Sequence, residues 1–507
     1  MNALRSNKSL LRAVCLLLAA LFVFASCGND AAVDELTQPE EETTAYEPPA
    51  GAISVPYTKL DPLNPFKMES LVNASLVSLV YDSLFMLDGG FMPVPLIAKE
   101  YTMTGAELHV QLDDSLVFSD ASALTAADVA YSFEKAKESP LWGESLSSVV
   151  SCAPAGSFAV DFTLKSADVN AVNLLTFPVV RDGTAEEDTV MPIGSGRYYY
   201  AVEDGRALLR CNLRYGGGVP RIGSVRLREV TESATLMHIL NIGGIDCFYT
   251  DLSDGVAKRS YAGSNEVYLN ELVFLGVNHA NLNLANAEFR KALSLAVSRS
   301  AIAANAFVSH ARAASTPFNT SWEMLSGFVE AGSGDADRGA ADALLAGLGS
   351  GVGRSETHLS MIVNDETDAF VKSAANLIVE ELSYVNVTVD LQTLSAGAFK
   401  LALMKGEFDL YIGDIKLTKN MDLSPFFSAY GAARWGIDLD AMSLDETYFD
   451  YKSGAKELST FLDAFAEVMP FIPLVYRNGQ FCYSRVIRSA IQSTEDRLFY
   501  NVEEWVV

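Results

Sequence analysis

The chain has 507 residues, of which 49% are hydrophobic and 20% charged. This length and composition can bury cores in two or three domains and exclude a chain that is disordered throughout. The formal net charge of −27 argues against DNA, RNA or an anionic lipid surface as partner, because like charges repel.

The first 26 residues are predicted to be a secretory signal. Basic residues precede an apolar run at 13–24, and two small residues then lead to Cys27. Such a run is too short for a stable membrane span, and the small residues mark a cleavage point. The pattern resembles the lipobox of bacterial lipoproteins, with Phe24 where leucine is usual, and predicts that Cys27 is lipidated. The alternative is an ordinary signal peptide whose cysteine is incidental.

Residues 28–50 are predicted to be an acidic tether. They are rich in Asp, Glu, Thr and Pro and contain no Lys or Arg, so they can bury little apolar surface. No later apolar run approaches the roughly 20 residues of a membrane-spanning helix. We therefore expect a soluble body that is anchored only at its end.

Helical and strand-like segments alternate in the first part of the body. Apolar residues at helical spacing across Leu76–Leu87 predict an amphipathic helix with one buried face. Alternation predicts a strand at Leu108–Leu112, and Ala207–Cys211 resembles another. Thr125 followed by Asp128 predicts a capping box at the start of a helix.

The second part shows a β-α-β order. A strand is predicted at Leu272–Val277, followed by a helix that Asn286 caps. One face of this helix carries an apolar stripe that is expected to be buried. We expect Arg290, Lys291 and Arg299 to lie largely off this stripe. The stripe consists of Phe289, Leu293, Ala296 and Val297. Further on, helices at Phe370–Leu382 and Ala398–Met404 alternate with strands at Val385–Leu391 and Phe408–Ile412, which predicts a mixed sheet flanked by helices.

The sequence gives no sign of catalytic or metal chemistry. The five histidines are scattered without an HExxH pair, and there is no GxSxG motif or cysteine beside a candidate base. The glycines at 347–353 lack the Lys-Ser/Thr of a phosphate-binding loop and are interpreted as a helix exit. Four cysteines remain in the body, and export would permit disulfides, but their apolar neighbours favour buried free thiols. We predict no catalytic residue, cofactor or metal site.

Several motifs carry a family resemblance. Phe118–Val129 reads F-S-D-A-S-A-L-T-A-A-D-V and is similar to the pattern F-S-D-G-x-P-L-T-A-x-D-V of the family 5 extracellular solute-binding proteins, the dipeptide- and oligopeptide-binding group. Pro192–Tyr198 is similar to P-x-G-T-G-P-Y, and Arg290–Arg299 to R-x-A-L-x-x-A-I-D-R. Shorter matches occur in the same order as in the family, at Leu63–Pro65, Val80–Leu84, Pro95–Ala98, Gly406–Leu410 and Pro470–Leu474.

The resemblance implies an α/β fold with two lobes, the type II periplasmic-binding-protein-like fold, with mixed sheets flanked by helices and an extra subdomain in the first lobe. Two chain crossings, near Leu272–Val277 and near Val475–Asn478, are expected to form the hinge. The implied boundaries are 1–26 for the signal and 27–50 for Cys27 and the tether. For the body they are 51–70, 190–271 and 478–507 for the core of lobe I, 71–189 for its extra subdomain and 272–477 for lobe II.

One segment of the resemblance bears on ligand binding. Peptide binders of the family carry an aromatic-x-Gly-Asp sequence whose aspartate pairs with the peptide α-ammonium, and Tyr411-Ile412-Gly413-Asp414 resembles it. A carboxylate is a natural partner for a desolvated ammonium, because the charge-assisted hydrogen bond is short and strong. The ligand-binding residues implied are Asp414, Tyr411 and Gly413. Alternatively, Asp414 merely ends a strand and Tyr411 belongs to the core.

The resemblance implies a monomeric lipoprotein at the cell surface or in the periplasm, which binds small peptides and delivers them to an ABC permease. A nickel chelate, an opine or a sugar is the alternative ligand within the same fold. A peptide-sensing receptor without import is a further alternative. An exported hydrolase would need a nucleophile and base that the sequence does not display.

Overall fold

The computed structural model describes residues 49–328, 334–348, 357–439 and 443–507. The predicted signal, Cys27 and nearly all of the predicted tether lie outside these ranges, as do Gly349, Gly351 and Gly353. No helix in the described ranges is both long and apolar enough to cross a membrane.

The first sheet has four strands in the order β1-β10-β9-β8, in which β1 is parallel to β10 and the other pairs are antiparallel. β9 is the strand predicted at Ala207–Cys211, which is thereby confirmed. The strands are β1 (Gly51–Tyr57), β8 (Tyr198–Glu203), β9 (Arg206–Cys211) and β10 (Ile222–Glu229).

A second, antiparallel sheet has the order β4-β5-β7-β6, and helix α4 (Ala126–Lys137) contacts β6 and β7. The predicted capping box starts this helix, because the Thr125 N–H donates to Asp128 Oδ2 over 2.8 Å. The strands are β4 (Ala98–Thr104), β5 (Glu107–Leu112), β6 (Val149–Pro154) and β7 (Ala159–Leu164).

The single helix predicted across Leu76–Leu87 is wrong. The chain forms two short helices, α2 (Leu71–Ala74) and α3 (Val77–Val80), and then enters strand β2 (Phe85–Leu87), which pairs with β3 (Pro93–Pro95). The apolar residues are nevertheless buried as predicted. The turn at 88–90 allows the residues before it to pair with those after it as a hairpin. Over so few residues, the spacing of apolar side chains cannot distinguish a buried strand from a buried helix.

The third sheet has seven strands. Its order is β11-β17-β12-β16-β14-β15, and β13 pairs with β17. The pairs β14–β15 and β14–β16 are parallel, and the others are antiparallel, so the predicted mixed sheet is confirmed. The strands are β11 (Cys247–Thr250), β12 (Gly263–Val277), β13 (Ala311–Ala313), β14 (Thr357–Asn364), β15 (Val387–Leu394), β16 (Leu410–Lys416) and β17 (Ile472–Tyr483).

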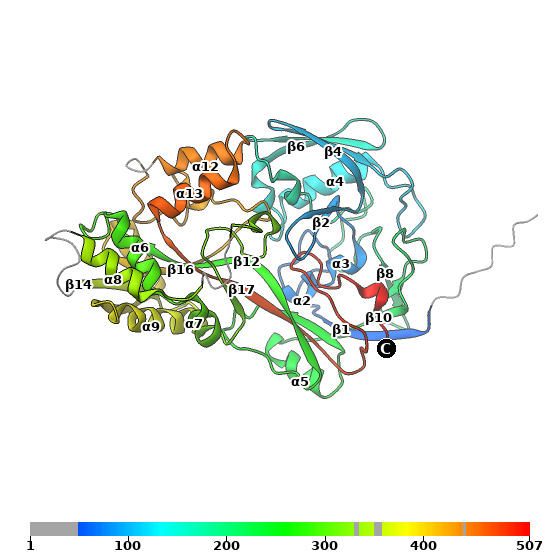
Figure 1. Cartoon of the computed structure of the whole chain (residues 1–507). Helices are drawn as coiled ribbons and strands as arrows, with labels where there is room; N and C mark the ends of the chain where they lie inside the picture. The colour runs from blue at the N-terminus through cyan, green and yellow to red at the C-terminus, as the bar shows by residue number, and fades with distance from the viewer. Residues whose placement is uncertain (1–48, 329–333, 349–356, 440–442) are drawn as a thin grey trace, which may run out of the picture. The chain divides into compact units, whose positions relative to one another are not determined.

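Helices accompany this sheet, and α9 contacts β15 while α6 contacts α8 and α9 (Figure 1). The Asn286 side chain accepts from the Glu288 N–H and caps α6 as predicted. The helices are α5 (Leu236–Asn241), α6 (Ala287–Ala296), α7 (Arg299–Ala301), α8 (Arg338–Gly347), α9 (Ala369–Ser383), α10 (Ala396–Lys405), α11 (Ser424–Phe427), α12 (Leu444–Lys452) and α13 (Leu458–Val468).

Two arginines that the sequence placed away from the buried stripe of α6 are themselves buried. Arg290 and Arg299 are 2% and 5% exposed. Their guanidinium groups donate to backbone carbonyls, which for Arg299 include those of Ser294, Ala314 and Pro473. Periodicity misses this role because a buried guanidinium is acceptable only where acceptors satisfy its donors. Several of these acceptors, at Val468, Met469 and Pro473, come from a distant segment of the chain.

The four body cysteines, Cys152, Cys211, Cys247 and Cys482, are free thiols, and all but Cys152 are fully buried. Burial raises the pKa of Cys482 to about 12. A thiol with so high a pKa stays protonated and is a poor nucleophile at neutral pH.

The long strands β12 and β17 each belong to more than one hydrophobic cluster. Val267 of β12 and Phe481 of β17 pack in the cluster that contains β1, whereas Leu275 and Leu474 pack with α6 and α9. The pairing register between the two strands shifts between Tyr268 and Leu272. The two strands therefore connect two separately packed cores.

Candidate ligand-binding site

The edge of β16 that faces β14 is only partly paired within the described residues. The Leu417 N–H donates to the Asn270 carbonyl and the Asn278 N–H to the Asp409 carbonyl, so odd-numbered residues of this strand bond to β12. Even-numbered residues therefore direct their N–H and C=O groups to the opposite edge. Among the described residues, β14 pairs with that edge only at Leu410 and Tyr411. The backbone groups of Asp414 and Lys416 thus lie beyond the paired region.

Asp414 lies on this edge and its side chain is 41% exposed. Partial burial of the side chain raises the pKa of the Asp414 carboxyl, and the nearby Arg477 opposes that rise. The ion pair between the two is long, with 3.7 Å between Arg477 Nη1 and Asp414 Oδ2. Asp414 therefore keeps most of its capacity to accept hydrogen bonds.

Three carboxylates share the guanidinium of Arg477. Its Nη1 atom lies 2.7 Å from Asp368 Oδ2 and 3.2 Å from Glu271 Oε1, in addition to the longer contact with Asp414. Asp368 also makes a second interaction: its Oδ1 accepts a hydrogen bond from the Phe370 N–H and so caps α9. One cation for three acids leaves the group with an excess of negative charge.

These groups line a cavity of about 570 Å³. Its wall also contains Phe399, Trp435 and a fourth carboxylate, Glu366. A second cavity of about 280 Å³ has Glu271 in its wall too, so Glu271 borders both cavities. The size of the first cavity lies in the range of pockets that bind small molecules.

The second cavity combines an apolar wall with paired charges. Trp142 contributes to the wall, and Lys419 lies over its ring, 5.3 Å from the centroid. Lys419 also donates to Thr176 Oγ1 over 2.7 Å and pairs with Asp496, and Lys416 pairs with Glu495 over 3.0 Å. Each of these lysines therefore has a carboxylate partner of its own, whereas three carboxylates of the first cavity share Arg477.

Sequence reasoning did not identify Glu271. Burial raises its pKa to about 7, and Arg477 opposes the rise. The one available signal is its position directly before the apolar run predicted at Leu272–Val277. A carboxylate directly beside a buried apolar run is unusual and needs a partner, but the sequence does not show that Arg477 supplies it.

Tyr411 and Gly413 lie on the face of β16 opposite to the Asp414 side chain, because side chains alternate along a strand. Tyr411 is 3% exposed, its ring packs edge-on against Phe274, and its hydroxyl donates to the Ala433 carbonyl over 3.1 Å. A Cβ atom on Gly413 would lie 2.8 Å from Phe274 Cζ. These two residues border the first cavity, but most of their contacts are with core residues.

Residues 92–436 match the family described as "Bacterial extracellular solute-binding proteins, family 5 Middle". The chain belongs to this family. As a family 5 solute-binding protein of ABC importers, it is a transport binding protein and not an enzyme. Its place is extracellular, in the periplasm or at the cell surface. A comparison of the sequence with curated proteins gave no match.

Solved structures share the type II periplasmic-binding-protein fold of this family 5 protein. The substrate-binding protein CtaP of an ABC transporter from Listeria monocytogenes has a TM-score of 0.68 at 20% identity, over 90% of this chain and 99% of that chain. NikA from Brucella suis, in complex with Fe(III)-EDTA, has a TM-score of 0.66 at 17% identity with the same coverage. The oligopeptide-binding protein AppA from Bacillus subtilis, in complex with a nonapeptide, has a TM-score of 0.55 at 17% identity, again with that coverage.

Proposed function

We propose that this family 5 protein captures small peptides and delivers them to a membrane permease. The observation that carries the proposal is the position of Asp414 beside an unpaired strand edge in a cavity of about 570 Å³. The peptide α-ammonium pairs with this carboxylate through a charge-assisted hydrogen bond. The peptide backbone adds to the edge of β16, where Asp414 and Lys416 direct their N–H and C=O groups.

The charge of the first cavity supports a ligand that carries an ammonium group. Four carboxylates and one guanidinium line it: Glu271, Glu366, Asp368, Asp414 and Arg477. Such a wall attracts a cation and repels an anion. It therefore disfavours an anionic chelate such as the Fe(III)-EDTA named for the NikA structure.

We also propose that β12 and β17 form the hinge between the two lobes. The proposed lobe boundaries are those that the family resemblance implies. Both strands pass from one hydrophobic cluster to another, and the register shift at Tyr268–Leu272 interrupts their pairing between the clusters. Bending at such a point leaves each core intact. Closure about this hinge would enclose the peptide, which is then presented to the permease.

The proposed anchor is Cys27, whose lipidation would tether a monomeric body to the membrane through residues 28–50. Support comes from the lipobox-like sequence and the acidic composition of the segment that follows it. Radiolabelled palmitate is expected to enter the native protein and to be absent from a Cys27→Ser variant.

Native mass spectrometry with a tripeptide library tests the peptide proposal. Wild-type protein is expected to retain peptides with a free N-terminus and to reject the same library after N-acetylation. Asp414→Asn keeps the shape of the side chain but removes its charge, and we expect it to weaken peptide binding roughly tenfold to a hundredfold. Glu366→Gln, which removes an exposed carboxylate from the same cavity, is the matched control and is expected to bind nearly as wild type does.

Two results would contradict the proposal. Equal binding of the free and acetylated libraries would remove the ammonium from the recognition mechanism. If the wild-type protein bound neither library, peptide would be the wrong ligand class, and the family membership would be unaffected.

A further inference from the structure

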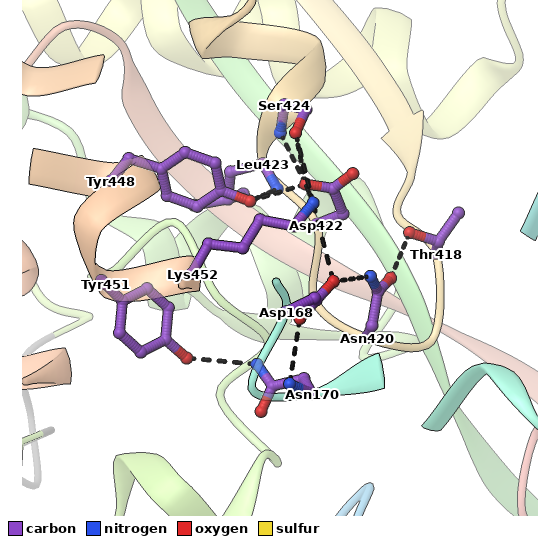
Figure 2. A network of polar contacts seen from close by, with 10 residues as sticks. All are labelled: Asp168, Asn170, Thr418, Asn420, Asp422, Leu423, Ser424, Tyr448, Tyr451 and Lys452. Atoms are coloured by element: carbon purple, nitrogen blue, oxygen red, sulfur yellow. Dashed lines mark hydrogen bonds and ion pairs between the residues drawn. The ribbon is translucent and has the colours of Figure 1, made fainter. Parts of the chain in front are cut away.

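A network of buried polar groups joins two parts of the chain that belong to different sheets (Figure 2). One part is the segment 168–170, which follows β7 of the antiparallel four-stranded sheet. The other part comprises the loop 417–424, which follows β16 of the seven-stranded sheet, and helix α12. By the proposed lobe boundaries, the first part is in lobe I and the second is in lobe II.

Asp168 is the charged residue that the first part contributes. Its side chain is 5% exposed, and its Oδ1 accepts from the backbone N–H of Asn170 over 2.9 Å. Its Oδ2 accepts from Asn420 Nδ2 over 2.7 Å and lies 3.6 Å from Lys452 Nζ. Two residues of the other part therefore contact a single oxygen of Asp168.

Lys452, at the end of α12, contacts a second carboxylate in its own part. Its Nζ donates to Asp422 Oδ1 over 2.7 Å, and the Tyr448 hydroxyl donates to the same oxygen over 2.6 Å. The ammonium is therefore flanked by one carboxylate from each part, and its side chain is only 12% exposed. Figure 2 shows Lys452 extending between Asp168 and Asp422.

Backbone groups join the two parts at the same place. The Val169 N–H donates to the Lys452 carbonyl over 2.9 Å. The Asn170 side-chain amide donates to the Tyr451 hydroxyl over 3.2 Å. Separation of the two parts must break these hydrogen bonds together with the bond between Asn420 and Asp168.

Lys452 decides whether the electrostatic interaction at Asp168 and Asp422 favours or opposes the contact. Burial raises the pKa of Asp168, while Lys452 opposes the rise and Asp422 adds to it. With the ammonium present, two carboxylates can approach each other away from water. Without it, two like charges would face each other in a poorly hydrated site, and separation would relieve their repulsion by hydrating both.

We propose that Lys452 is an electrostatic latch, which holds the two lobes together by placing one cation between Asp168 and Asp422. None of these three residues lines either of the two cavities described above. The latch therefore sets the balance between open and closed lobes without contacting the ligand. The apparent affinity for a ligand that requires closure varies with the closed fraction. The inference rests on the proposed lobe boundaries and does not depend on the ligand being a peptide.

Hydrogen–deuterium exchange of the segment 168–170 tests the latch, because the Val169 amide bonds directly across the contact. Purified protein without added ligand is compared with a Lys452→Met variant, and small-angle X-ray scattering gives the radius of gyration of each. We expect exchange to be roughly tenfold to a hundredfold faster in the variant, and its radius of gyration to increase. Addition of Asp168→Asn is expected to restore slower exchange, because it removes the like-charge repulsion.

Lys456→Met is the matched control. Lys456 pairs with Asp450 over 3.0 Å within the same part of the chain, and both side chains are about half-exposed. This variant is expected to exchange as wild type does. If Lys452→Met prevents folding, Asn420→Ala takes its place and is expected to speed exchange by a smaller factor. Unchanged exchange in a folded Lys452→Met or Asn420→Ala variant, or a double variant that shows no reversal, would overturn the proposal.

Discussion

Arg477 Nη1 lies 3.2 Å from Glu271 Oε1, and the two residues belong to the adjacent strands β17 and β12. Burial nevertheless outweighs this ion pair and raises the pKa of Glu271 to about 7. The folded protein therefore binds a proton at Glu271 more tightly than the unfolded chain does, and Glu271 reduces the free energy of unfolding progressively as the pH rises from about 4.5 to 7.

Replacement of Glu271 by Gln is expected to remove this penalty. Relative to wild type, the free energy of unfolding of the variant should increase by up to about 3 kcal/mol between acidic pH and pH 8. Urea denaturation in a series of buffers from pH 4.5 to 8 measures this difference. A difference between Glu271→Gln and wild type that does not change with pH would show that Glu271 titrates alike in the folded and unfolded states.

Replacement of Arg299 by Met is expected to destabilise the protein strongly. The buried guanidinium donates to the carbonyls of Ser294, Ala314 and Pro473, so its removal leaves three buried acceptors without their donor. We expect the free energy of unfolding to fall by at least about 3 kcal/mol, from roughly 1–3 kcal/mol for each unsatisfied group. Arg259→Met, at an exposed position, should change stability by no more than about 0.5 kcal/mol. Equal losses in both variants by chemical denaturation would contradict this account of Arg299.

Two glycine substitutions should act in opposite directions. A Cβ on Gly413 would come within 2.8 Å of the Phe274 ring, and Gly413→Ala is expected to cost about 1–3 kcal/mol through overpacking. A Cβ on Gly397, in helix α10, meets nothing within 4 Å, so Gly397→Ala should stabilise by up to about 1 kcal/mol. Thermal unfolding followed by circular dichroism distinguishes the signs. A neutral Gly413→Ala would mean that Phe274 moves aside without strain.

The sequence predicted local elements better than it predicted contacts between distant segments. The capping box at Thr125 and Asp128 and the Asn286 cap are confirmed, because both depend on residues within a few positions of each other. The helix across Leu76–Leu87 failed because the hairpin that replaces its second half depends on pairing with β3. The burial of the apolar residues in this segment was nevertheless predicted correctly. Burial depends on the apolar character of the side chains and not on whether they lie in a helix or a strand.

The candidate site shows the same limit. The family resemblance pointed to Asp414, but neither periodicity nor spacing places Glu271 and Arg477 beside it. These residues lie on three different strands, and they come together only because antiparallel pairing aligns β12 with both β16 and β17. Likewise, nothing in the sequence around Asp168 indicates that Lys452 lies 3.6 Å away. Prediction of such a group requires the strand register and the loop paths, which a single sequence does not provide.

The side-by-side course of β12 and β17 also restricts how the two cores can move. Hydrogen bonds between the two strands fix their separation, so this pair within the seven-stranded sheet resists stretching and in-plane shear but bends more readily out of the plane of the sheet. A joint of this kind leaves essentially one degree of freedom. For the proposed hinge, this means that each opening would retrace the path of the preceding closure, so that groups on the two proposed lobes return to the same alignment on every cycle.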